Sequence, residues 1–143
     1  MNGFEYVADL SIEDKILFLK MIIRLIGYDN KIDEHERSFV KELAHQYKIP
    51  GQYWSEINEY VDENELLNAA RKLERKKALY LIKELLMVAN TDNDFDEREI
   101  DFVVKVSEAT QIESTKVTDI NRLVLDQMAL IERYHDVMEF ETD

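Results

Sequence analysis

Acidic side chains gather in two short segments of the chain, and their types and spacing could serve metal chemistry. Hard divalent cations such as Ca²⁺, Mg²⁺ and Mn²⁺ take carboxylate oxygens as ligands. Crowded carboxylates also repel one another until a cation neutralises them. In the second segment, aspartate stands at every second position from 92 to 96, whereas the first segment has Lys31 at the position equivalent to Asp94. The candidate metal ligands are Asp29, Asp33 and Glu36 in the first segment and Asp92, Asp94, Asp96 and Glu99 in the second.

The calcium loop of the EF-hand is the obvious comparison, and the second segment departs from it at two decisive positions. Its first, third and fifth ligand positions carry aspartate, as the loop requires. The sixth position, normally Gly, is Glu97, and the twelfth, normally a bidentate Glu, is Val103. Val40 stands at the twelfth position of the first segment. Neither segment is therefore an EF-hand loop, and both valines suit a hydrophobic core.

Helix capping gives the same acidic residues a structural interpretation. Asp33 and Asp96 occupy N-cap positions, and Glu36 and Glu99 follow at the third helical position, which is the spacing of a capping box. Capping leaves three acids without an explanation: Asp29, Asp92 and Asp94. The sequence leaves the choice between metal binding and capping open.

The two acidic segments are copies of one phrase, because residues 29–36 return 63 positions later as residues 92–99. Alignment of residues 17–49 with residues 80–112 needs no gap and gives nine identities, five of them within the phrase. The repetition predicts a duplicated helix–turn–helix unit, spanning about residues 11–49 and 74–112. We expect the apolar helices of the two units to pack together around a pseudo-twofold axis.

Apolar residues recur at helical spacing along the whole chain, which predicts an all-α fold. We expect one compact domain over residues 1–143, built as a bundle of about six to seven helices. The helices near residues 12–26 and 79–89 are apolar on nearly every side and therefore belong in the middle of the bundle. Shorter helices are expected after Pro50 and near residues 63–72.

The last helix, predicted at about residues 114–140, carries apolar residues outside its main stripe. Leu123, Leu130 and Val137 recur at intervals of seven. We favour the interpretation that the bundle covers this helix on two sides, as is common for globular helices. The alternative is a surface for a dimer or for another partner.

Composition limits the function further. The chain carries 31 acidic and 18 basic residues and a net charge of −13, so its field repels nucleic acid. It has no cysteine and only three glycines, which excludes thiolate sites, cysteine nucleophiles and a glycine-rich phosphate loop. Its longest apolar segments are short and interrupted by charges, so we expect no membrane span and a cytoplasmic location. Peripheral membrane association stays open.

The paired phrase resembles the tellurite-resistance TerB-like family. In residues 22–43 and 85–106 an apolar helix runs into Asp-small-x-apolar-x-x-x-Glu and then into a second amphipathic helix. The family's usual Asp-Gly is Asp-Asn in both copies. The resemblance implies an internally repeated helical fold and an acidic motif suspected of binding divalent cations. By position, the motif's acids are Asp29, Glu36, Asp92 and Glu99.

These observations lead to two functional hypotheses. The preferred one is a noncatalytic, stress-associated TerB-like accessory protein that binds a divalent cation (Ca²⁺, Mg²⁺ or Mn²⁺) through its paired acidic turns and acts with a protein partner. The alternative is a protein–protein interaction adaptor whose acidic turns only cap helices. A homodimer is compatible with both.

Overall fold

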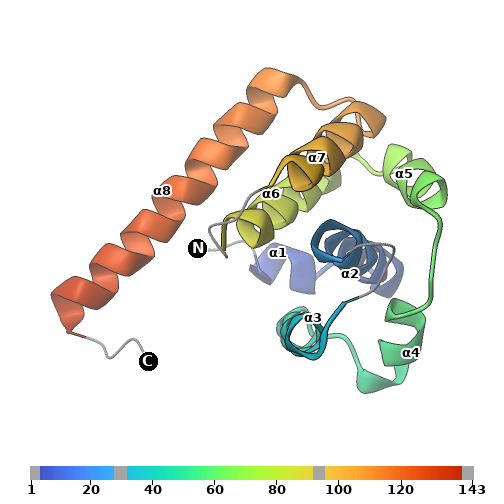
Figure 1. The fold of residues 1–143 in the computed structure, drawn as a ribbon, viewed down its shortest axis with the longest axis horizontal. Helices are drawn as coiled ribbons and strands as arrows, with labels where there is room; N and C mark the ends of the chain where they lie inside the picture. Colours follow the sequence, from blue (N-terminus) through green and yellow to red (C-terminus); the bar gives the residue numbers. More distant parts are fainter. Residues whose placement is uncertain (1–3, 28–31, 92–95, 140–143) are drawn as a thin grey trace.

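The computed structural model describes residues 4–27, 32–91 and 96–139, and these ranges contain helices and their connections but no strand (Figure 1). The predicted all-α class is confirmed. The helices are α1 (Phe4–Ala8), α2 (Ile12–Ile26), α3 (Glu34–Gln46), a 3₁₀ turn η1 (Gly51–Tyr53), α4 (Trp54–Ile57), α5 (Glu63–Arg71), α6 (Arg75–Thr91), α7 (Glu97–Ala109) and α8 (Ser114–Met138). The short helix α1 is the element that the sequence pattern does not predict.

The two nearly all-apolar helices, α2 and α6, pack against each other at the centre, as predicted (Figure 1). Ser11 caps α2 by accepting a hydrogen bond from the amide of Asp14 at 3.2 Å. Leu19 and Ile22 of α2 and Leu85 of α6 are completely buried. Each such side chain contributes about 1.5–3 kcal/mol through burial, so this contact is a main source of stability.

The charged residues that interrupt α2 hold a loop in place. Lys20 donates from Nζ to the carbonyl of Glu59 at 2.8 Å, and Arg24 donates from its guanidinium to the carbonyl of Val61 at 2.9 Å. These bonds satisfy carbonyl groups in the connection between α4 and α5. The two basic side chains therefore hold this loop against α2 rather than only pointing into solvent.

The helices α3 and α7 repeat each other in local structure at an offset of 63 residues. Both have 13 residues. Both end in a left-handed residue, Lys48 with φ 60° and Gln111 with φ 58°. In each case the isoleucine that follows donates its amide to the carbonyl five residues earlier, at 3.1 Å and 2.9 Å, which completes a Schellman motif. The pseudo-twofold relation between the two units stays a prediction.

The last helix, α8, packs its inner half on α6 and α7 and then projects from the body (Figure 1). Leu123, Leu130 and Val137 are 54%, 63% and 68% exposed, so the predicted cover on two sides is wrong within the described residues. Length explains Leu130 and Val137, because 25 residues span about 37 Å whereas the 17 residues of α6 span about 25 Å. Leu123 lies in the packed half of α8, next to the buried Val124, on a side of the helix that the body leaves uncovered. Of the helices described, none combines the length and the apolar character needed to cross a membrane.

Candidate functional site: the paired acidic turns

Both acidic turns form complete capping boxes. The amide of Glu36 donates to Asp33 Oδ1 at 2.7 Å, and the amide of Asp33 donates to Glu36 Oε1 at 3.0 Å. The same pair of bonds joins Glu99 and Asp96, at 2.8 Å and 3.3 Å. The capping prediction is confirmed for these four acids. Each box satisfies amides at the start of its helix, and the carboxylates also favour the positive end of the helix dipole.

The remaining three candidate ligands lie outside the described residues: Asp29, Asp92 and Asp94. Within the ranges that are described, no group of three or more His, Asp or Glu side chains is arranged to hold a metal ion. The metal site as a whole stays a prediction.

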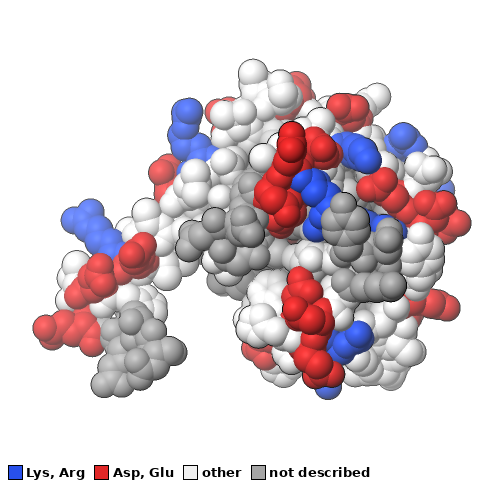
Figure 2. Space-filling view, in the orientation of Figure 1, with Lys and Arg blue, Asp and Glu red and all other residues white. Residues whose placement is uncertain are grey.

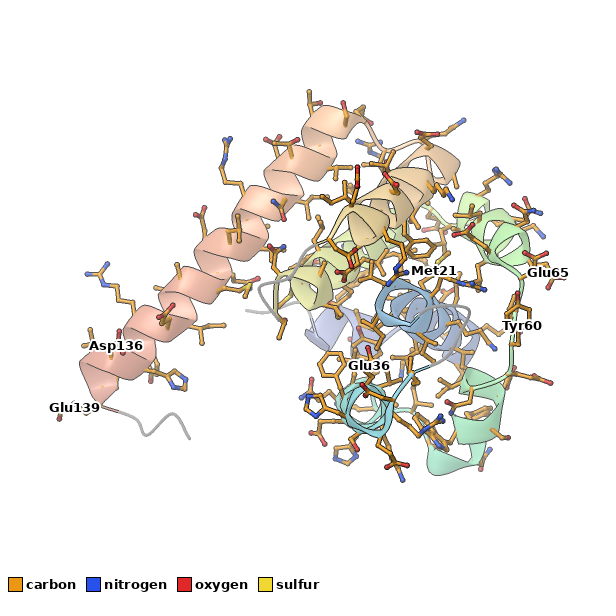
Figure 3. All side chains as sticks on the ribbon, in the orientation of Figure 1. Met21, Glu36, Tyr60, Glu65, Asp136 and Glu139 are labelled. Atoms are coloured by element: carbon orange, nitrogen blue, oxygen red, sulfur yellow. The ribbon has the colours of Figure 1, made fainter. Side chains whose placement is uncertain are left out.

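The structure brings the two turns to one hollow, a cavity of about 270 Å³ that we name the elbow cavity. Figure 3 labels Glu36 on the side of α3 that faces α2, and Figure 2 shows acidic side chains over both α3 and α7. The lining residues are Ile26, His35, Glu36, Phe39, Val88, Thr91, Asp96, Arg98 and Glu99. Glu36 and Glu99, which are 63 positions apart, thus face the same space, whereas Asp33 does not line it.

Arg98 sets the electrostatics of the elbow cavity. Its guanidinium donates to the carbonyl of Leu25 at 2.6 Å and to the carbonyl of Arg24 at 3.3 Å. These carbonyls belong to the last turn of α2, where a cation also meets the negative end of the helix dipole. A positive charge therefore lines the same cavity as the carboxylates of Glu36 and Glu99.

Sequence reasoning missed Arg98, although a signal was present. The equivalent residue of the first copy is His35, which is exposed. The two copies thus differ at a position where the second unit bonds to the first.

A second unpredicted feature is a buried pair in the core, between Tyr47 at the end of α3 and Glu84 in α6. The Tyr47 hydroxyl donates to Glu84 Oε1, while Oε2 has no hydrogen-bond partner among the described residues. Burial raises the pKa of the Glu84 carboxyl from its ordinary value of 4.5, although the bond from Tyr47 acts in the opposite direction. Burial, followed by the charge of Glu84, raises the pKa of Tyr47 well above 10.0.

Comparison of the chain with family models, with curated proteins and with solved structures finds no match. The resemblance to the TerB-like family stays a prediction that depends on the repeated phrase alone.

Proposed function

We propose that the protein is a noncatalytic interaction module whose projecting helix docks onto another protein chain. The observation that carries this proposal is the exposure of the outer half of α8, defined as residues 129–138. Every residue in it is exposed except His135, which is half-buried. Five of them are large and apolar: Leu130, Ile131, Tyr134, Val137 and Met138. A contiguous exposed apolar surface of this kind is typical of binding sites.

The spacing of these side chains suits helix recognition. Leu130, Tyr134 and Val137 follow one another at the i, i+4 and i+7 positions, which place them on one side of a helix. Glu132 and Asp136 fall on the opposite side, so the outer half is amphipathic although nothing in the described chain covers it. A helix of this pattern is stabilised when its apolar side is buried against another surface.

The proposal is tested by placing a photo-crosslinking amino acid at Tyr134 in the intact chain, in cells that make the protein. The apolar face predicts a crosslinked product from this position. The matched control places the same amino acid at Glu132, on the opposite side of the helix, and should yield little product. Equal labelling from both positions, or none from Tyr134, would contradict the proposal.

The elbow cavity supports a second candidate function, the binding of a divalent cation. Carboxylates from both turns, those of Glu36, Asp96 and Glu99, line this one cavity. Oxygen ligands are those that Ca²⁺, Mg²⁺ and Mn²⁺ prefer. This is also the accessory role that the TerB-like resemblance implies.

Calorimetry with Ca²⁺, Mg²⁺, Mn²⁺ and Zn²⁺ tests the cation candidate. We expect binding heat and a raised melting temperature that the variant Glu36→Gln with Glu99→Gln loses, because each change removes a charge but keeps the shape. Glu34→Gln removes an exposed acid outside the cavity and serves as the control. Absence of heat and of a thermal shift at millimolar metal would remove this candidate.

A further inference from the structure

We propose that the occupant of the outer half of α8 is a second copy of this chain, bound antiparallel. This inference rests on the proposed docking function and names its partner. The exposed residues of α8 suit this occupant because their spacing forms a coiled-coil seam, with intervals that alternate between three and four residues. The seam residues are Leu123, Gln127, Leu130, Tyr134 and Val137, all of them exposed except Gln127, which is half-buried.

An antiparallel pair aligns this seam with itself. When Gln127 lies opposite the second copy's Leu130, Leu123 falls opposite the second copy's Tyr134. Leu123, Leu130 and Tyr134 then each meet a residue of the second copy, whereas Val137 lies beyond the paired part of the seam. The contact is isologous, because the same surface is used by both copies.

Charge decides between the antiparallel and the parallel arrangement. Asp126 and Arg133 are exposed and flank the seam on the same side, seven residues apart. In the antiparallel register the Asp126 of each copy lies beside the second copy's Arg133, and symmetry forms this pair twice. In a parallel pair these charges would instead lie beside Ile131 and Met138, which occupy the other flank of the seam.

The net charge of −13 gives a further reason for the antiparallel arrangement. Both bodies repel each other, and a parallel pair would place them at the same end of the helices. The antiparallel pair places them at opposite ends, a separation of tens of ångströms along the helix. The Debye length at physiological salt is about 8 Å, so the repulsion between the bodies is then largely screened.

Sedimentation equilibrium on the purified chain, with charge reversals, tests the register. Arg133→Asp should weaken the dimer several-fold, because it places like charges together at two sites, and Asp126→Arg should do the same. The double variant Asp126→Arg with Arg133→Asp should restore the affinity. Asp136→Arg, on the opposite side of the helix, is the control and should not weaken it. A chain that stays monomeric at high micromolar concentration overturns the inference, as does a double variant that is no better than the single ones.

Single cysteines test the orientation, since the chain has none of its own. In the antiparallel pair the two Leu130 positions lie near the symmetry axis, whereas the two Val137 positions lie about 25 Å apart along the helices. A short bismaleimide should therefore link Leu130→Cys but not Val137→Cys. Efficient linking at both positions would show a parallel pair and overturn the arrangement.

The photo-crosslinking experiment at Tyr134 separates this inference from the proposed function. A product of twice the chain mass, with the attachment mapped near Leu123, supports the second copy. Products of other masses without a dimer overturn the second copy while the docking function stands. Absence of any product overturns both. Circular dichroism of each variant shows that α8 and the body remain folded.

Discussion

The two acidic turns share a sequence and a cap, yet they lie in different surroundings. The helix that follows the first turn, α3, packs mainly against α2, whereas α7 packs against α2, α5, α6 and α8. The phenylalanine on the second turn of each helix shows the consequence, because Phe39 is 37% exposed and Phe102 is 3% exposed. Glu36 is likewise half-buried where Glu99 is buried.

A repeated motif therefore determines local geometry, whereas the elements that follow it in the chain determine how deeply its residues are buried. The first unit is followed by α4 and α5, and α5 packs against α7 of the second unit rather than against α3. The second unit is followed by α8, which packs against α6 and α7. The second copy is thus enclosed by elements from both halves of the chain, and the first remains near the surface.

The largest difference in stability that this comparison predicts is between alanine variants of the two phenylalanines. Phe102→Ala removes a buried ring and should lower the free energy of unfolding by about 3–5 kcal/mol. Phe39→Ala should cost no more than about half of that, because much of its ring already meets solvent. Urea denaturation of both variants measures the difference. Equal losses would show that α3 is as enclosed as α7, contrary to the structure.

The sequence alone predicts the features that depend on residues close to one another along the chain. A capping box joins residues three positions apart, so its spacing is visible in the chain itself. The central position of α2 and α6 follows from their own apolar surfaces. The exposure of the outer half of α8 did not follow, because it depends on the length of a different helix against which α8 packs.

The same reason explains why the elbow cavity and the buried pair were missed. Arg98 reaches carbonyls 73 and 74 residues away along the chain, and Tyr47 bonds to Glu84 across 37 residues. Neither partner is marked by a local pattern. Only the tertiary arrangement, in which α7 crosses the end of α2 and α3 ends beside α6, brings these groups together.

The next effect on stability in order of size concerns one of the three positions at which the two phrases differ. Arg98→Met keeps the apolar stem but removes two charge-assisted bonds to the last turn of α2, and should cost about 1.5–3 kcal/mol. His35→Met, at the equivalent exposed position, should change stability by no more than about 0.5 kcal/mol. Thermal unfolding followed by circular dichroism compares them. A harmless Arg98→Met would mean that the carbonyls of α2 are as well satisfied by water.

Removal of the N-cap side chains should change stability by a smaller amount. Asp33→Ala and Asp96→Ala each remove an N-cap side chain, a loss of about 1 kcal/mol. We expect the second to cost more, because the Asp96 side chain accepts a hydrogen bond from the backbone amide of the buried Glu99, and this amide loses its partner away from water. Urea titrations of both variants, with Glu34→Ala as an exposed first-turn control, resolve the difference. A larger loss of stability for Asp33→Ala than for Asp96→Ala would contradict this expectation.

At acid pH the smallest change in the free energy of unfolding is expected at a position where the two units differ in polarity. This change is also the one that depends most on pH. Glu84 of α6 corresponds to Met21 of α2 at the same offset of 63 residues, and both side chains are buried. Glu84→Met makes the second unit resemble the first at this position, and Tyr47→Phe in the same chain removes the other member of the bonded pair. Such paired replacement by apolar groups of similar shape is often nearly neutral, within about 1 kcal/mol.

The pH dependence of that double variant separates the burial of a carboxyl from simple packing. Because the folded-state pKa of Glu84 is raised above 4.5, the folded chain holds a proton that the unfolded chain has released between pH 4.5 and the raised value. The free energy of unfolding of the natural chain should therefore fall as the pH rises through this window and level off above it. Tyr47, whose pKa is raised above 10.0, adds a fall of the same sign in alkali. The double variant lacks both groups, so its stability relative to the natural chain should rise with pH across each window. Urea titrations at a series of pH values measure this difference. A constant difference would mean that Glu84 keeps its ordinary pKa in the core, and the contrast with Met21 would then be one of shape alone.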